Sequence, residues 1–139
     1  MPEGRHLRGL IDTSVVIDLH RVAATDLPEL VAVSAVSMAE LAAGPHATDD
    51  VEERARRQDL LVRTAATFEA VPFDDDAARA YGRVYAAVVK AGRKARGQRA
   101  FDLLIAATAM AARLPLYTRN PSDFVALAGL LEVVATEVS

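Results

Sequence analysis

The chain has 139 residues, of which 52% are hydrophobic and 25% are charged, and its formal net charge is −3. This length and composition predict one globular domain over residues 1–139 and argue against a disordered chain. The absence of cysteine excludes disulfides, thiolate zinc sites and cysteine nucleophiles. The negative charge and the aromatic content of 5% argue against a protein that coats nucleic acid in bulk or mainly stacks bases.

The sequence also predicts that the protein does not enter a membrane. Residues 1–6 lack the charged and apolar regions of a signal peptide. The apolar stretches at 103–112 and 124–131 have about ten residues or fewer, whereas a membrane-spanning helix needs about 20. We therefore expect a cytoplasmic location.

Hydrophobic periodicity and turn signals predict alternating strands and helices in the first half of the chain. In chain order, we expect a strand over 7–11, a helix over 15–21, a strand over 29–36, a helix over 37–43 and a charged surface helix over 49–67. The apolar side of the last helix is expected to carry Val51, Ala55, Leu60, Leu61 and Ala65.

The second half continues the alternation. In chain order, we expect a strand over 69–73, a helix over 77–90 that breaks near Gly92 or Gly97, an apolar helix from 101 to 113, a strand over 116–118, a short helix over 124–127 and a strand over 131–135. This pattern predicts an α/β domain with a mostly parallel sheet and helices on both faces. In such folds the reactive crevice lies beyond the carboxyl ends of the strands.

Four acidic residues lie where strands are expected to end or the next helix to begin: Asp12, Glu40, Asp102 and Asp123. Each has a purely structural interpretation. Asp12 and Asp102 can cap helices, Glu40 can form a capping box with Ser37, and Asp123 can belong to a turn. Together, however, four carboxylates at one sheet edge would repel each other. Because all the candidate ligands are oxygens, the compensating ion would be Mg²⁺ or Mn²⁺, which suits phosphodiester hydrolysis.

The sequence contains no motif for a different catalytic apparatus. The glycine-rich phosphate loop, the dinucleotide fingerprint and the Gly-x-Ser-x-Gly elbow are all absent. The three histidines, His6, His20 and His46, do not have zinc-ligand spacing.

Four segments of the chain resemble a known family. They read LIDTSVVID at 10–18, SMAELAAG at 37–44, DLLIAATA at 102–109 and LYTRNPSDF at 116–124. In this order and spacing they resemble the PIN-domain family, and within it the VapC toxins of bacterial toxin–antitoxin pairs. The resemblance covers nearly the whole chain.

The resemblance implies a Mg²⁺- or Mn²⁺-dependent ribonuclease on a PIN-like three-layer fold, with a central parallel sheet of about five strands and helices on both faces. It implies that Asp12, Glu40 and Asp102 are the central metal-binding acids. It also implies a homodimer that cuts tRNA or rRNA. A VapB-type antitoxin would inhibit it by inserting a C-terminal segment into the active-site groove.

The fourth acidic position has two candidates, Asn120 and Asp123. Many PIN domains have aspartate where this chain has Asn120, and VapC-like chains often keep asparagine there with an aspartate three residues later. We therefore choose Asp123 as the fourth acid, with Asn120 as a neutral polar contributor, and leave open whether one or two ions bind. Thr13, Ser14 and Thr118 are candidates to hydrogen-bond the acids or metal-bound water, or else are ordinary capping residues.

Positive charge is concentrated in one segment. Residues 77–101 contain seven basic and no acidic residues. We expect the part of this segment nearest Asp102, together with one residue near the fourth acid, to contact RNA phosphates: Lys90, Arg93, Lys94, Arg96, Arg99 and Arg119. The alternative is a solvated helix end, where cations are also favoured.

The leading functional prediction is a metal-dependent endoribonuclease toxin that cleaves cellular RNA. Two alternatives stay open. One is a non-catalytic PIN-like module that binds RNA or protein, and the other is a PIN nuclease with a housekeeping role in RNA processing. The first predicts metal binding without cleavage, and the second predicts that expression without a partner is not toxic.

Overall fold

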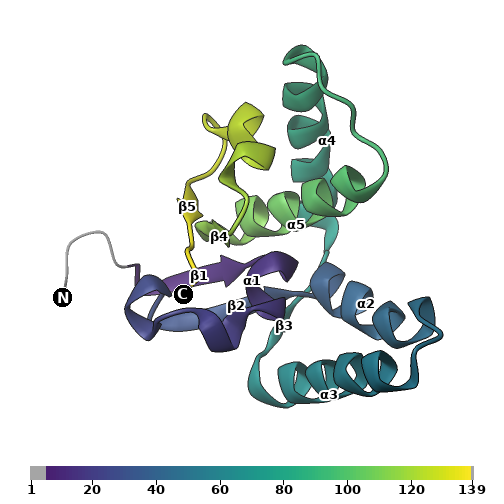
Figure 1. Ribbon diagram of the computed structural model, residues 1–139. Helices are drawn as coiled ribbons and strands as arrows, with labels where there is room; N and C mark the ends of the chain where they lie inside the picture. The colour runs from purple at the N-terminus through teal and green to yellow at the C-terminus, as the bar shows by residue number, and fades with distance from the viewer. Residues whose placement is uncertain (1–5, 139) are drawn as a thin grey trace.

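Five parallel strands form a single sheet in the order β3-β2-β1-β4-β5 in the computed structural model, which describes residues 6–138 (Figure 1). The strands are β1 (Arg8–Ile11), β2 (Leu30–Ser34), β3 (Ala70–Val71), β4 (Leu116–Thr118) and β5 (Val133–Ala135). The helices are α1 (Thr13–Ile17), α2 (Ala35–Ala43), α3 (Val51–Thr67), α4 (Asp75–Lys90) and α5 (Gln98–Ala112). Short 3-10 segments are η1 (Leu19–Arg21), η2 (Ala24–Asp26), η3 (Gly44–Ala47) and η4 (Pro121–Leu127).

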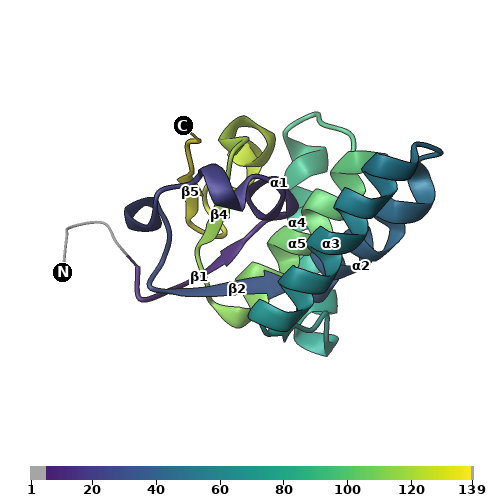
Figure 2. The same ribbon diagram turned by 60° about the horizontal axis from the view of Figure 1, so that its bottom comes forward.

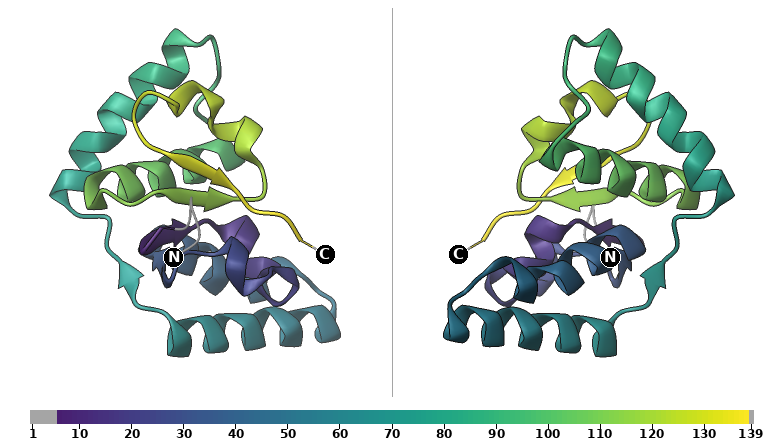
Figure 3. Two further views of the ribbon diagram at one scale, coloured as in Figure 1. Left: turned by 90° about the vertical axis from the view of Figure 1, so that its left-hand side faces the viewer. Right: turned by 90° about the vertical axis from the view of Figure 1, so that its right-hand side faces the viewer.

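Successive residues of β1 point to opposite faces of the sheet, and each face carries its own apolar cluster. Leu10 packs with Leu116 and with the buried residues of α4, α5 and η4. Ile11 packs with Tyr117 on the other face, together with residues of α1, α2 and α3. The predicted three-layer α/β architecture, with helices on both faces of a five-stranded parallel sheet, is therefore confirmed (Figures 1 and 3).

The helices that follow β1 and β2 begin earlier than predicted, because the last polar residue of each strand region caps the next helix. Asp12 accepts a hydrogen bond from the Val15 amide, so α1 starts at Thr13 rather than at 15. Ser34 accepts one from the Ser37 amide, so β2 ends at 34 rather than 36. The predicted helix over 15–21 is also interrupted, since α1 ends at Ile17 and η1 follows.

The helix α5 starts at Gln98, three residues before its predicted start. Gly97, at φ +70°, and Gly92, at φ +77°, both have positive backbone φ angles, so both predicted break points lie in the connection between α4 and α5. Residues 91–97 form this connection, which runs from the end of α4 down to the start of α5 in Figure 1.

The long helix α3 is a surface helix, as predicted, but its predicted apolar side is partly wrong. Val51 is 78% exposed and Ala55 and Ala65 are not buried, whereas Leu60 and Leu61 pack against the α1–α2 cluster. The helix contacts mainly α2 and η3. Figures 2 and 3 show it along the outside of the molecule, so much of its surface, including these small and β-branched residues, faces solvent.

No helix within residues 6–138 combines the length and apolar content needed to cross a membrane. The first five residues, on which part of the prediction of no signal peptide depends, lie outside the described residues.

Gly9 in the central strand has no room for a side chain. A Cβ at this position would lie 2.6 Å from a ring carbon of Tyr117 and 3.0 Å from Pro28. We expect Gly9→Ala to lower the free energy of unfolding by about 1–3 kcal/mol through overpacking. Gly82→Ala in α4 is the matched control, since nothing lies within 4 Å of its added Cβ. It is expected to stabilise the helix by up to about 1 kcal/mol. Urea unfolding of both variants checks this, and equal stabilities would contradict it.

Candidate active site

The four predicted acids come from four different parts of the fold and interact electrostatically. Asp12 directly follows β1, Glu40 is on α2, Asp102 is on α5 and Asp123 is in η4. The pKa of Asp102 is raised from 3.8 to about 6, first by burial and then by the negative charges of Asp12, Asp123 and Glu40. The fold therefore brings the four acidic positions into one region.

Asp12 lies at the end of the central strand and is only 4% exposed. Its Oδ1 accepts hydrogen bonds from Ser14 Oγ at 2.5 Å and from the Val15 amide at 3.2 Å, and Thr118 bonds the same carboxyl group. Hydrogen bonds to a charged group contribute about 1.5–3 kcal/mol each, whereas burial of a carboxylate costs several. Burial outweighs the bonds here, because the pKa of Asp12 is raised. Asp12 is thus both a helix cap and a buried acid whose charged form is disfavoured.

Glu40 does not form the capping box that was its structural alternative. Ser34 caps α2, and the Glu40 carboxylate instead contacts two other helices. Thr13 Oγ1 on α1 donates to Oε1 at 2.7 Å, and Gln98 Nε2 on α5 donates to Oε2 at 3.0 Å. Both oxygens of Glu40 therefore have a neutral donor.

Three hydroxyl groups line up behind Glu40. Thr13 uses its one hydrogen on Glu40, so the 2.8 Å contact between Thr13 Oγ1 and Ser37 Oγ is donated by Ser37. Ser34 Oγ in turn donates to Ser37 Oγ at 3.3 Å. Ser34 and Ser37 are fully buried. Each hydroxyl in this chain therefore donates toward the Glu40 side, and Thr13 makes the last bond to the carboxylate.

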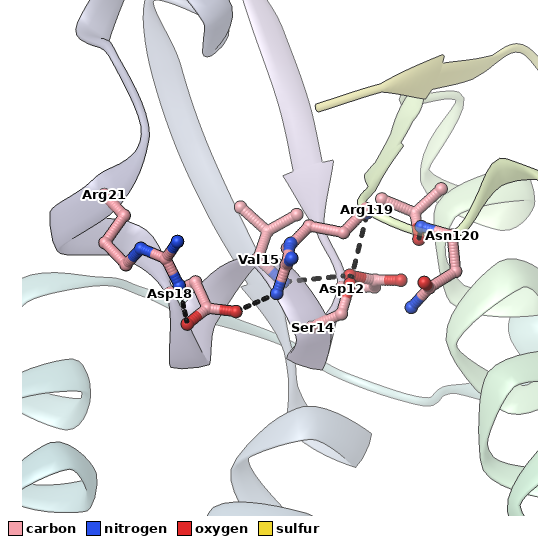
Figure 4. Close-up of polar contacts among 8 residues, drawn as sticks. Asp12, Ser14, Val15, Asp18, Arg21, Arg119 and Asn120 are labelled. Atoms are coloured by element: carbon pink, nitrogen blue, oxygen red, sulfur yellow. Dashed lines mark hydrogen bonds and ion pairs between the residues drawn. The ribbon is translucent and has the colours of Figure 1, made fainter. Parts of the chain in front are cut away.

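Asp102 is not a helix cap, because Gly97 occupies the cap position and Asp102 lies one turn into α5. Asp123 gives no side-chain support to its turn, since its carboxylate makes no hydrogen bond or ion pair with residues 6–138. Its main-chain carbonyl accepts a 2.9 Å hydrogen bond from Arg99 Nη1. Figure 4 shows the side chain of Asn120 turned toward Asp12. The charge of Asp123 acts on Asp102, so both candidates for the fourth position lie beside the site.

The donor set suits a hard divalent cation. The candidate ligands are all carboxylate or amide oxygens, and the pKa of Asp102 is raised first by burial and then by three neighbouring negative charges, which a cation would offset. No group of three or more His, Cys, Asp or Glu side chains within residues 6–138 is close enough to form a complete ligand set.

Two of the predicted RNA-contacting arginines have partners inside the protein. Arg99 bonds Asp123, and its charge opposes the rise in the pKa of Asp102. Arg119 pairs with Asp18 across the end of α1, as Figure 4 shows, while its amide donates to Ser14 Oγ at 3.2 Å. Four other cations have exposed side chains that make no ion pair or hydrogen bond within the described residues: Lys90, Arg93, Lys94 and Arg96.

A groove of about 860 Å³ adjoins the acidic site. It is bordered by α1, α2 and α3, and Thr13 and Glu40 lie in its wall. Apolar side chains from all three helices line it, among them the half-exposed Ile17 together with Leu41 and Leu60. This surface includes part of the apolar face of the first helices.

Both the sequence and the fold match those of known proteins. The PIN domain family model matches residues 9–130. The curated ribonuclease VapC5 of Mycobacterium tuberculosis is 38% identical over 128 residues, which are 90% of this chain and 91% of VapC5.

The chain belongs to the PIN domain family.

Two further relatives agree. Ribonuclease VapC8 of M. tuberculosis is 38% identical over 110 residues, 78% of this chain and 96% of VapC8. The crystal structure of VapBC-5 from M. tuberculosis, a member of the VapBC family of toxin–antitoxin systems, has a chain that superposes with a TM-score of 0.80 at 36% identity, covering 93% of this chain and 98% of that one.

Three polar residues next to the site of this PIN domain are not predicted from the sequence: Ser34, Asp18 and Gln98. The signal for Gln98 is its position four residues before Asp102, which puts both on one face of α5. The sequence does not reveal this shared face, because the predicted helix begins at 101. Asp18 carries no local signal for its contact, because Arg119 is 101 positions away. Ser34 contacts Ser37, only three positions away, but the predicted strand extends to 36 and so hides its role as a helix cap.

We expect Asp102→Asn to stabilise the metal-free protein at pH 8 by about 1 kcal/mol, a value reduced for partial solvent screening. The pKa of Asp102 is raised from 3.8 to about 6, so the folded state binds this proton more tightly than the unfolded chain does. That stabilisation is present at low pH and is lost between roughly pH 4 and 6, and ionised Asp102 destabilises the fold above this window.

Urea unfolding in EDTA at pH 4.5 and pH 8 measures this difference. The exposed Asp26→Asn, in η2, is the control and should change stability little at either pH. A metal-free Asp102→Asn protein that is clearly less stable than wild type at pH 8 would show that the acid is structural.

Proposed function

We propose that this PIN domain, over residues 1–139, is a metal-dependent endoribonuclease toxin of the cytoplasm that is neutralised by a VapB-type antitoxin. Its expected substrate is tRNA or rRNA, and its expected ion is Mg²⁺ or Mn²⁺. The observation that carries the proposal is the convergence of three negative charges on Asp102 at the carboxyl edge of the sheet. The ribonuclease relatives VapC5 and VapC8 support the reaction class.

The acids Asp12, Glu40, Asp102 and Asp123 would hold the ion, with Asn120 as a neutral neighbour. A bound divalent ion lowers the pKa of water and stabilises charge on the phosphate during an in-line displacement. Thr13, Ser14 and Thr118 orient the acids by hydrogen bonds. Because these donors are neutral, they fix the carboxylates without cancelling the charge that attracts the ion.

RNA would approach along the connection between α4 and α5. On or beside it lie exposed cationic side chains that make no ion pair or hydrogen bond with residues 6–138: Lys90, Arg93, Lys94 and Arg96. The connection leads directly into α5, which carries Asp102. Phosphate contacts of this kind supply affinity with little sequence preference. We assign Arg99 and Arg119 a weaker part in RNA binding, since each guanidinium already has a partner within the protein.

The groove between α1, α2 and α3 is the expected antitoxin site, because it is partly apolar and reaches Glu40. A segment seated there would lie against the acidic site. We also propose a homodimer, for which Tyr85 and Val89 offer exposed apolar surface one turn apart on α4.

Cleavage of total RNA by the purified protein tests the proposal. With Mn²⁺ or Mg²⁺ we expect discrete fragments, which disappear with EDTA and in Asp12→Asn and Asp102→Asn. Each substitution removes a carboxylate charge while keeping side-chain volume, so activity should fall by at least about a hundredfold. The Asp26→Asn protein, altered at an exposed position in η2 that is none of the four acids, should cleave like wild type.

Two outcomes would favour the alternatives. Mn²⁺ binding by calorimetry without cleavage would indicate a PIN-like binding module. Cleavage in the assay without toxicity, when the chain is expressed alone, would indicate a housekeeping nuclease.

We expect Arg93→Gln and Lys94→Gln to weaken RNA binding, because each substitution removes one cation that can pair with a phosphate. Each variant should raise KM, leave kcat largely unchanged, and reduce the slope of log affinity against log salt by about 0.7 to 1. Arg83→Gln removes an exposed charge from the middle of α4 and is the matched control. If all three variants show the wild-type salt slope, RNA does not follow this connection.

A further inference from the structure

Gln98 has no role in the function proposed above, yet its side chain contacts one of the acids. It is the first residue of α5 and follows the cationic connection directly. Its Nε2 donates to Glu40 Oε2 at 3.0 Å, across 58 positions of sequence. The contact therefore joins α5 to α2 at the acidic site.

With this contact, both carboxylate oxygens of Glu40 accept a hydrogen bond from another helix. Thr13 donates to Oε1 at 2.7 Å and is itself backed by buried Ser37. Gln98 donates to Oε2 from the opposite helix. A carboxylate with a donor on each oxygen has a defined plane, whereas one with a single donor can still rotate about its last torsion. Thr13 alone would leave the Glu40 carboxylate able to rotate, and the second hydrogen bond, from Gln98, defines its plane.

Two further features place the first turn of α5 next to the acids. Gln98 lies four residues before Asp102 and so shares its helix face. The next residue, Arg99, donates to the main-chain carbonyl of Asp123 at 2.9 Å. Consecutive residues thus tie α5 to two further acidic positions, Glu40 on α2 and Asp123 in η4.

We propose that Gln98 is a positioning residue, which orients the Glu40 carboxylate relative to Asp102 and fixes the cationic connection to α2. Its kinetic consequence rests on the proposed ribonuclease function. Gln98 is neutral, so its replacement changes no charge and isolates the hydrogen bond. An alternative role, a direct contact with RNA, would act on substrate binding instead.

The first test needs neither metal nor substrate. The chain contains only two glutamines, Gln58 and Gln98, and one asparagine, so its side-chain amide resonances are few. In the ¹⁵N-labelled full chain, Glu40→Ala should move the side-chain amide resonances of Gln98 and leave those of Gln58, exposed on α3, in place. The backbone resonances of the same spectrum report whether the variant is folded. Unmoved Gln98 resonances in a folded variant would overturn the proposal.

The second test separates positioning from RNA binding. Gln98→Met keeps the length of the side chain and removes the donor. We expect kcat to fall about tenfold, in the range typical of residues that orient ligands, with KM unchanged. Gln58→Met on α3 is the matched control and should retain wild-type kinetics. A raised KM with unchanged kcat would assign Gln98 to RNA binding, and unchanged kinetics would make the contact incidental. Either result overturns the proposal.

The two tests also separate this inference from the proposed function. If wild type cleaves no RNA, the ribonuclease proposal fails, while the amide resonances still decide whether Gln98 holds Glu40. If wild type cleaves RNA and Gln98→Met does so equally well, the ribonuclease proposal stands and this inference fails.

Discussion

The burial of one carboxylate, Asp12, at the carboxyl end of the central strand is the constraint on which the rest of the site depends. The main-chain amide of Asp12 donates to the Tyr117 carbonyl at 3.0 Å, so the end of β4 is held beside Asp12. Its side chain caps α1, so the first helix must start there. Burial of the charge is tolerated because Ser14, Val15 and Thr118 bond the carboxyl group. The elements that carry the remaining acids are then placed around this fixed group.

Neutral donors, rather than cations, hold the acids in place. Glu40 is bonded by Thr13 and Gln98, and Asp12 by Ser14 and Thr118. Salt bridges would hold the same side chains, but they would also cancel the negative charge that a divalent ion requires. The cation Arg99 does lie close to the acids, but it has only a limited effect on the pKa of Asp102. Arg99 only partly opposes the raised pKa of Asp102, because burial and three neighbouring negative charges act in the other direction.

The charge of Arg119 is directed away from the acids in a similar manner. Its guanidinium pairs with Asp18 at the far end of α1, and Arg21 approaches the same carboxylate at 3.9 Å. Only the main-chain amide of Arg119 supports the site, through Ser14. This arrangement leaves the acidic region bordered by two different surfaces, the cationic connection before α5 and the partly apolar groove along α3. Glu40 contacts Gln98 at the start of α5 and also lies in the wall of the groove.

The fold class, the order of the strands and helices, and the meeting of four acids at one edge of the sheet could be predicted from the sequence. These follow from local patterns, because alternating apolar runs define strands and helices, and parallel strands present their carboxyl ends at one edge. Local pattern could not say which of two structural roles a polar residue takes. The Ser37–Glu40 spacing suits a capping box, but Ser34 caps the helix, and this releases Glu40 to face Thr13 and Gln98. The sequence likewise predicts that Arg99 and Arg119 contact RNA, whereas in the fold their guanidinium groups bond Asp123 and Asp18. Only the tertiary structure decides such pairings, because their partners lie 24 and 101 positions away along the chain, and no local spacing encodes that distance.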